Sequence, residues 1–178
     1  FLSQAELSEA SLVARPFHPD EIQAIRARHT CPVVFVALGM SAQFTQPVSV
    51  EGVDAYFYVT EGVPLTGSNV TVIPYSTLHT QDYVAAADYV ITKAGWGTVA
   101  ECLLAQKPMA LFARDSVLED RTTIRLLEQK KLAIKVTYEQ LTEMSDLLEQ
   151  MKQITYPAVP EYHNAAAEIV SKLLTLTE

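Results

Sequence analysis

Short, almost wholly apolar runs recur along the chain, and glycine, proline or polar residues separate them. The run over 33–38 is continuous and ends at Gly39, which is typical of a parallel strand buried on both faces. The later runs are rich in β-branched and aromatic residues, as strands usually are. The expected strands are 33–38, 55–59, 70–73, 89–92, 109–113 and 133–136.

Between these runs lie stretches with apolar residues three or four positions apart, which is the spacing of amphipathic helices. One stretch places four apolar residues on one side, predicting a buried face at Met144, Leu147, Leu148 and Met151. The expected helices are 19–29, 80–87, 98–106, 121–129, 138–153 and 161–176. The alternation of strands and helices predicts an α/β domain with a doubly wound, mostly parallel sheet and C-terminal helices.

The pattern also predicts how the chain is organised. Residues 1–30 are polar and mixed before a short helix, and we expect them to lead from a missing N-terminal domain. Residues 31–178 have the length of one α/β domain. The stretch over 41–54 contains Pro47 and Gly52 and has weak periodicity, so we expect a crossover there without a well-formed helix.

The most informative segment is 90–101, where a strand runs into a glycine-containing turn and a helix follows at once. Gly95 and Gly97 allow a ligand to approach the backbone closely, and both can adopt a positive φ. Thr98 is placed to cap the helix, whose free N–H groups and dipole favour an anion. Glu101 lies one turn further along, within reach of a hydroxyl beside that anion. The segment therefore predicts a diphosphate at the turn and a ribose at the carboxylate.

Two other interpretations of this segment stay open. Thr98 and Glu101 also form the pattern Thr-x-x-Glu, in which the two side chains cap the helix and no ligand is needed. The spacing Gly-x-Gly-x-x-Ala from Gly95, with Asp115 about twenty residues on, also fits the dinucleotide fingerprint of a nicotinamide-dependent oxidoreductase. That fingerprint normally follows the first strand of its domain, whereas this turn follows the fourth expected strand.

A resemblance to a known family is carried by two segments, DYVAAADYVITKAGWGTVAE over 82–101 and QKPMAL over 106–111. Together they resemble the C-terminal domain of family 28 glycosyltransferases, a group that includes the bacterial peptidoglycan N-acetylglucosaminyltransferase and the plastid galactolipid synthases. The resemblance implies the Rossmann-like, donor-binding half of a GT-B fold. The chain is also similar to the glycosyltransferase-like segment of plant arabinose kinases, where the matching strand likewise ends in an Arg-Asp pair, here Arg114-Asp115.

The resemblance further implies roles for individual residues, which we state as expectations. Those expected at the donor phosphates are Gly95, Trp96, Gly97, Thr98, Gly39 and Ser41. Glu101 is expected to hold the ribose, and Ile73 and Tyr75 are expected to face the base. The residues expected to face the donor sugar are Met40, Glu119 and Asp120. Family members that transfer sugar usually carry Glu-Gln or Asp-Gln where this chain has Glu119-Asp120.

From these observations we expect the UDP-sugar-binding half of an inverting glycosyltransferase, of the hexosyltransferase type. In that fold the acceptor site and the base belong to an N-terminal domain, in the same or a partner chain, so no catalytic residue is assigned here. The chain alone is then expected to transfer nothing. One alternative is a sugar-nucleotide sensing or scaffold domain that has lost catalysis, and the other is the oxidoreductase described above.

Composition narrows the class of protein. The formal net charge is −8 and the chain has no cluster of Lys and Arg, which excludes a sequence-independent nucleic-acid binder. No apolar run reaches the length of a membrane span. The four histidines lack the spacing of metal ligands, so we expect neither a metal nor a cofactor besides the donor. Cys31 and Cys102 are expected to be reduced thiols of a cytoplasmic protein, and peripheral attachment to a membrane is left open.

Overall fold

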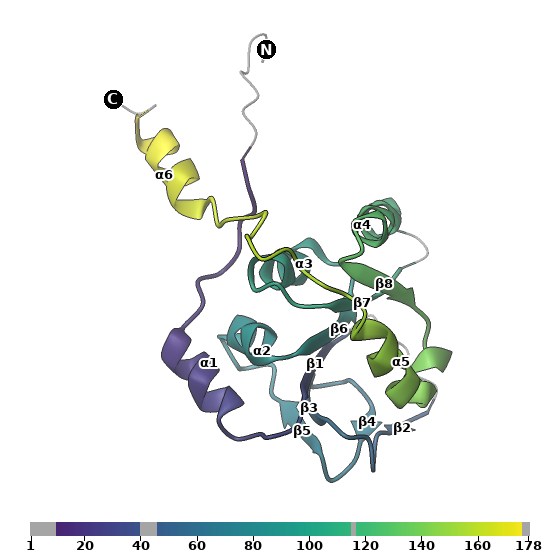
Figure 1. Cartoon of the computed structure of the whole chain (residues 1–178). Helices are drawn as coiled ribbons and strands as arrows, with labels where there is room; N and C mark the ends of the chain where they lie inside the picture. The colour runs from purple at the N-terminus through teal and green to yellow at the C-terminus, as the bar shows by residue number, and fades with distance from the viewer. Residues whose placement is uncertain (1–9, 40–45, 115–116, 176–178) are drawn as a thin grey trace.

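The computed structural model describes residues 10–39, 46–114 and 117–175. Its centre is a six-stranded sheet in which every neighbouring pair of strands is parallel (Figure 1). The strands are β1 Val33–Ala37, β3 Tyr56–Thr60, β5 Val70–Ile73, β6 Tyr89–Lys93, β7 Met109–Phe112 and β8 Ala133–Val136. All six strands expected from the sequence are confirmed, with bounds that differ by one residue or less at most ends.

The order of the strands across the sheet is β5-β3-β1-β6-β7-β8. Counted along the chain among these six, the order is 3-2-1-4-5-6, that of a doubly wound Rossmann-like sheet. The predicted fold class is therefore confirmed. In such a sheet the connections leave β1 and β6 in opposite directions, so a crevice opens between them at the carboxyl ends of the strands.

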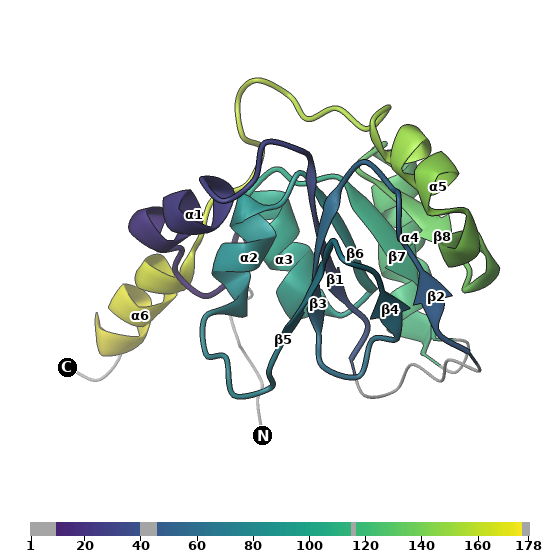
Figure 2. The same ribbon diagram turned by 90° about the horizontal axis from the view of Figure 1, so that it is seen from below.

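From β5 onward the helices alternate with the strands, whereas β1 to β5 follow one another without a helix in the described residues. The helices are α1 Pro19–Arg26, α2 Thr80–Ala86, α3 Trp96–Leu104, α4 Leu118–Gln129, the 3-10 helix η1 Glu139–Glu143, α5 Met144–Met151 and α6 Ala166–Thr175. Figure 2 shows α2 and α3 on one face of the sheet, with α5 on the other. Figure 1 shows α6 projecting away from the sheet, and none of its residues is buried.

Strand β1 shows why the sheet has a core on each face. Its residues alternate, so Val33 and Phe35 belong to one buried cluster while Val34 and Val36 belong to the other. Residues of α1, α2, α3 and α4 complete the first cluster, and residues of η1 and α5 complete the second. Because β1 is covered on both faces, apolar side chains are favoured at every position, which explains its continuous apolar run.

The second cluster contains all four apolar residues predicted to be buried on the helical stretch over 138–153, namely Met144, Leu147, Leu148 and Met151. The prediction of one helix there is wrong, because the stretch divides into η1 and α5. At the junction Glu143 has φ −108° and ψ 51°, outside the helical region. The last helix was expected from residue 161 but begins at Ala166, whose N–H donates to the side-chain oxygen of Asn164 at 3.1 Å.

The crossover after β1 holds a feature that the sequence pattern did not predict. Strand β2 Val48–Ser49 pairs in parallel with β4 Leu65–Thr66, forming a separate two-stranded sheet. Strands of two residues are too short to give a periodic pattern. The absence of a well-formed helix in the described part of this crossover, residues 46–54, agrees with the prediction.

Two further findings concern the chain as a whole. Both cysteines are free thiols; Cys102 is buried in the first core cluster and Cys31 is partly exposed at the start of β1. Within 10–39, 46–114 and 117–175, every helix is too short or too polar to cross a lipid bilayer.

Candidate functional site

A cleft of about 270 Å³ lies at the carboxyl ends of the parallel strands. Its lining comes from the ends of β1, β3, β5 and β6 and from the first turns of α2 and α3. The lining residues are Ala37, Gly39, Thr60, Ile73, Pro74, Tyr75, Thr77, Thr80, Thr92, Lys93 and Thr98. The cleft therefore lies at the switch point between β1 and β6, where ligands bind in sheets of this topology.

One wall of the cleft is the start of α3, and here the structure corrects the sequence analysis. The helix begins at Trp96 rather than Thr98, its N-cap is Gly95, and no side chain caps it. Gly95 has φ −76° and Gly97 lies inside the first turn, so the expectation of a positive φ at either glycine is wrong. A Cβ at Gly97 would meet nothing within 4 Å, so a ligand can still approach the backbone there.

The first turn of α3 presents backbone donors to the cleft. The first backbone bond within the helix runs from the Val99 N–H to the Gly95 carbonyl at 3.1 Å. The N–H groups of Trp96, Gly97 and Thr98 precede it, and helix geometry leaves them without an intrahelical acceptor. Together with the helix dipole, these groups favour an anion at this point. Trp96 is half-exposed beside them, whereas the Thr98 side chain lines the cleft.

Lys93 adds a full positive charge to the same place. It is the last residue of β6, and its half-buried side chain crosses to the loop after β1. Gly39 in that loop has φ +67°, and a Cβ built on it would lie 3.0 Å from the Lys93 Nζ. Both the backbone angle and this close contact favour glycine at the position. The sequence analysis did not assign Lys93 to the site, although a lysine directly at the end of a buried strand was a usable signal.

The opposite end of the cleft is apolar. Ile73, at the end of β5, is buried, and Tyr75 follows it as an exposed aromatic side chain on the rim. The Tyr75 backbone N–H donates to the Glu61 carboxylate at 3.2 Å, which fixes the turn after β5. The two residues predicted to face a base therefore lie in the same cleft as Gly39 and Thr98.

Glu101, the residue expected to hold a ribose, has a partner that the sequence did not predict. The Arg15 Nε donates to the Glu101 Oε1 at 2.8 Å, and the Glu101 side chain is 4 % exposed. The carboxylate makes no capping bond to the start of α3, so the interpretation of Thr98 and Glu101 as a capping pair is wrong. No sequence signal joins Arg15 to Glu101, because 86 positions separate them.

The pair expected at the donor sugar divides into two different environments. Glu119 is exposed in the first turn of α4, whereas Asp120 is fully buried. The Asp120 carboxylate accepts bonds from the Arg114 backbone N–H at 2.9 Å and from its Nε and Nη2 at 2.8 and 2.7 Å. The Arg114 guanidinium holds the pKa of the Asp120 carboxyl below its usual range. Any contact with a sugar would require Asp120 to give up these bonds.

Three residues named in the sequence analysis, Met40, Ser41 and Asp115, lie outside the described residues. Their expected roles stay predictions. Among the residues that are described, no group of three His, Cys, Asp or Glu side chains is arranged to hold a metal ion.

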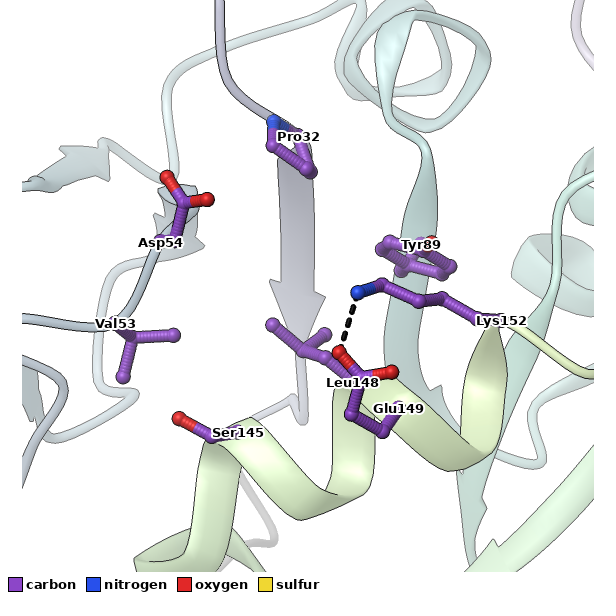
Figure 3. Close-up of a pocket in the computed structure, with 8 residues that line it drawn as sticks. All are labelled: Pro32, Val53, Asp54, Tyr89, Ser145, Leu148, Glu149 and Lys152. Carbon is purple, nitrogen blue, oxygen red and sulfur yellow. Dashed lines mark hydrogen bonds and ion pairs between the residues drawn. The ribbon is translucent and has the colours of Figure 1, made fainter.

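A second cavity, of about 140 Å³, lies at the amino ends of the central strands, where Pro32 precedes β1 and Tyr89 begins β6 (Figure 3). Its other wall is α5, and the Lys152 ammonium there donates to the Glu149 carboxylate across one helical turn. Burial raises the pKa of the Tyr89 hydroxyl, which already lies well above neutral pH in an exposed tyrosine. In this cavity the charges of Lys152 and Glu149 compensate each other.

Solved structures with the same fold are glycosyltransferases. The chain matches SnogD from Streptomyces nogalater with a TM-score of 0.56 and 20% identity over 84% of this chain and 44% of that one. It matches VinC in complex with dTDP with a TM-score of 0.58 and 16% identity, over 94% and 48% of the two chains. It matches Arabidopsis thaliana UGT89C1 complexed with UDP with a TM-score of 0.54 and 13% identity, also over 94% and 48%.

The chain thus spans less than half the length of these solved structures, and at these identities the likeness shows the fold. No curated protein matches the sequence significantly. The likeness to plant arabinose kinases stays a prediction.

A family model identifies the family to which the chain belongs. The model of the glycosyltransferase family 28 C-terminal domain matches residues 24–176, which is most of the chain. This match argues against the oxidoreductase, and so does the position of the turn, which follows the fourth strand of the main sheet along the chain and not the first. The chain belongs to the glycosyltransferase family 28 C-terminal domains, and it has the Rossmann-like fold of the matched part of these solved glycosyltransferases.

Proposed function

We propose that the cleft between β1 and β6 binds the donor of an inverting glycosyltransferase, and that this donor is a UDP-sugar. The diphosphate lies against Lys93 and the first turn of α3, the ribose hydroxyls bind Glu101, and the base lies between Ile73 and Tyr75. One observation supports this most strongly: the Lys93 side chain and the first turn of α3 meet at the switch-point cleft, with a shielded carboxylate one helical turn behind them.

The positive groups also suggest how the leaving diphosphate is stabilised. When the glycosidic bond to the donor breaks, negative charge grows on the β-phosphate. A lysine and backbone N–H groups fixed before the reaction stabilise that charge without rearranging. We therefore propose that the reaction uses no metal and no cofactor besides the donor. The Trp96 side chain, half-exposed in the same turn, shields the phosphates from water.

The acceptor and the base that deprotonates it are proposed to belong to a second domain, N-terminal to this one or on a partner chain. Two facts support this proposal: the chain spans less than half of the glycosyltransferases it resembles, and the cleft residues are suited to binding the donor. Catalysis requires donor, acceptor and base to be held together. This domain by itself is expected to bind donor and to transfer no sugar to lipid or sugar acceptors.

A second candidate function is a sensing or scaffold domain that binds the nucleotide sugar and takes no part in transfer. The observation that favours it is Asp120, which replaces the amide usual in active members and is held by Arg114. The two functions share the nucleotide site and differ at the sugar. A sensor would bind UDP and UDP-sugars in this cleft, and its full-length protein would consume neither.

The nucleotide class is tested by calorimetric titration of the domain with UDP, dTDP and NAD, together with melting temperatures. We expect UDP to bind, and at a hundredfold excess over its Kd to stabilise the domain by about 2.7 kcal/mol. NAD is expected to give no shift at the same concentration. Stabilisation by NAD without stabilisation by UDP would overturn the proposed function. Tighter binding of dTDP than of UDP would keep the diphosphate site and overturn the choice of base.

A further inference from the structure

The Arg15 side chain lies where the proposed function needs an open carboxylate. Besides the bond to Glu101, its guanidinium donates through Nη1 to the Leu78 carbonyl at 3.0 Å and through Nη2 to the Thr80 hydroxyl at 3.0 Å. Leu78 belongs to the turn between β5 and α2, and Thr80, the first residue of α2, also lines the cleft. Arg15 therefore joins the proposed ribose residue to the base side of the cleft.

The segment that carries Arg15 is fixed on both sides of it. Leu12 is buried and its carbonyl accepts the Ala165 N–H at 2.7 Å, so the segment pairs with the chain that leads into α6. On the other side, the His18 N–H and Nδ1 bond the buried Asp82 carboxylate at 2.9 and 2.8 Å. We name residues 11–18 the strap. Since these contacts hold the strap without Arg15, its guanidinium can leave Glu101 while the backbone stays in place.

The strap and a bound nucleotide would compete for one group. Arg15 bonds the Oε1 of Glu101, and two ribose hydroxyls on this carboxylate would need that oxygen and the space beside it that the guanidinium fills. The Glu101 carboxylate is almost wholly covered, whereas the Arg15 side chain is 46% exposed and can turn into solvent. Resting on the function proposed above, we propose that Arg15 is an internal competitor of the ribose, which lowers the affinity of the site for nucleotides that bind the Glu101 carboxylate.

The size of the effect follows from the exposure of the pair. An ion pair with one partner half in water contributes about 1 kcal/mol or less, because solvent screens it. A ligand that breaks this pair binds about fivefold more weakly than one that meets an open carboxylate. The strap is thus weak enough for a tightly bound diphosphate to displace, and it weakens by the same factor every ligand that uses the Glu101 carboxylate.

The test compares UDP binding by the parent domain, Arg15→Gln and Arg26→Gln. Arg26 is a matched control, because its Nη1 also bonds a carboxylate, Asp88, at 2.7 Å and its side chain is similarly exposed, at 43%, away from the cleft. Calorimetry should show about fivefold tighter UDP binding by Arg15→Gln and no change for Arg26→Gln. With 2′,3′-dideoxy-UDP, which cannot use the carboxylate, the gain should be clearly smaller.

The possible results separate this inference from the proposed function. Unchanged or weaker UDP binding by Arg15→Gln, with binding by the parent intact, would overturn the competitor and leave the UDP site standing. Weaker binding would mean that Arg15 orients Glu101 for the ribose. An equal gain for UDP and its dideoxy form would also overturn competition for Glu101. Failure of the parent and of both variants to bind millimolar UDP would overturn the proposed function and this inference together. Melting curves of the three proteins verify that each is folded.

Discussion

Replacing Lys93 with methionine tests the electrostatics of the cleft most directly. Methionine keeps most of the length of the side chain and removes its charge. Lys93 is half-buried at the end of β6, and its Nζ lies over Gly39, beside the first turn of α3. A phosphate bound at that turn would therefore meet the ammonium directly, and the substitution should weaken binding of the diphosphate.

An upper and a lower bound can be given for the loss of UDP affinity in Lys93→Met. Two unit charges about 4 Å apart attract each other by about 4 kcal/mol at an effective dielectric constant of about 20. Desolvation of the ammonium reduces the net gain, and a charge-assisted hydrogen bond typically contributes about 1.5–3 kcal/mol. We therefore expect Lys93→Met to bind UDP about 10- to 150-fold more weakly. Binding is not abolished, because the N–H groups at the start of α3 remain.

Calorimetric titration with UDP and with uridine distinguishes the loss of the Lys93 charge from other effects of the substitution on binding. Uridine lacks phosphates, so its affinity should be the same for the parent and for Lys93→Met. Lys152→Met serves as the control, because Lys152 pairs with Glu149 in the second cavity, at the amino ends of β1 and β6 (Figure 3). Equal UDP affinity in the parent and Lys93→Met would refute the placement of the diphosphate. An equal loss for uridine would show that the substitution disturbs the cleft itself.

Three other substitutions test the rest of the site. Glu101→Gln should bind UDP at least about tenfold more weakly by calorimetry and melt within a few degrees of the parent, since the carboxylate caps no helix; equal affinity would remove the ribose role. Gly39→Ala should lower the free energy of unfolding by about 1–2 kcal/mol in urea titrations, because φ is +67° and the new Cβ would lie 3.0 Å from the Lys93 Nζ. An unchanged urea midpoint would contradict this strain. Asp120→Asn should cost about 2 kcal/mol near pH 7, because it breaks a buried, charge-assisted bond to Arg114. The folded-state pKa of Asp120 is depressed, so its contribution is present above the ordinary pKa of about 4 and is lost as the pH falls through the folded value. The melting temperatures of parent and Asp120→Asn should accordingly converge in acid, and a constant difference down to low pH would contradict the ionic role.

The fold could be predicted because its signals are local. Each buried strand is a short apolar run, and the alternation of these runs with amphipathic stretches specifies a parallel sheet with helices on both faces. The failures have local causes as well. Periodicity continues from η1 into α5 although the backbone breaks at Glu143, and β2 with β4 is too short to produce a pattern.

The candidate site was only partly predictable, because its geometry depends on contacts between distant parts of the chain. The segment around Gly95 could be located from its sequence, but the helix starts two residues earlier than Thr98 suggested. Trp96 and Gly97 are poor markers of a helix start, whereas threonine is a strong one. The contacts of Lys93 with Gly39 and of Arg15 with Glu101 arise from the arrangement of β1, β6 and the strap, which no spacing along the sequence encodes.

The two thiols differ in reactivity, and this difference allows the opening of the domain to be measured. Burial raises the pKa of the Cys102 thiol far above its usual value, so the reactive thiolate is almost absent while the first core cluster stays closed. Cys31 is partly exposed just before β1, at the ends of the strands away from the cleft. An alkylating reagent will thus mark Cys31 in the native state and Cys102 only during excursions that open the core. The rate at which the second label appears, with and without nucleotide, reports how strongly the ligand keeps the domain closed.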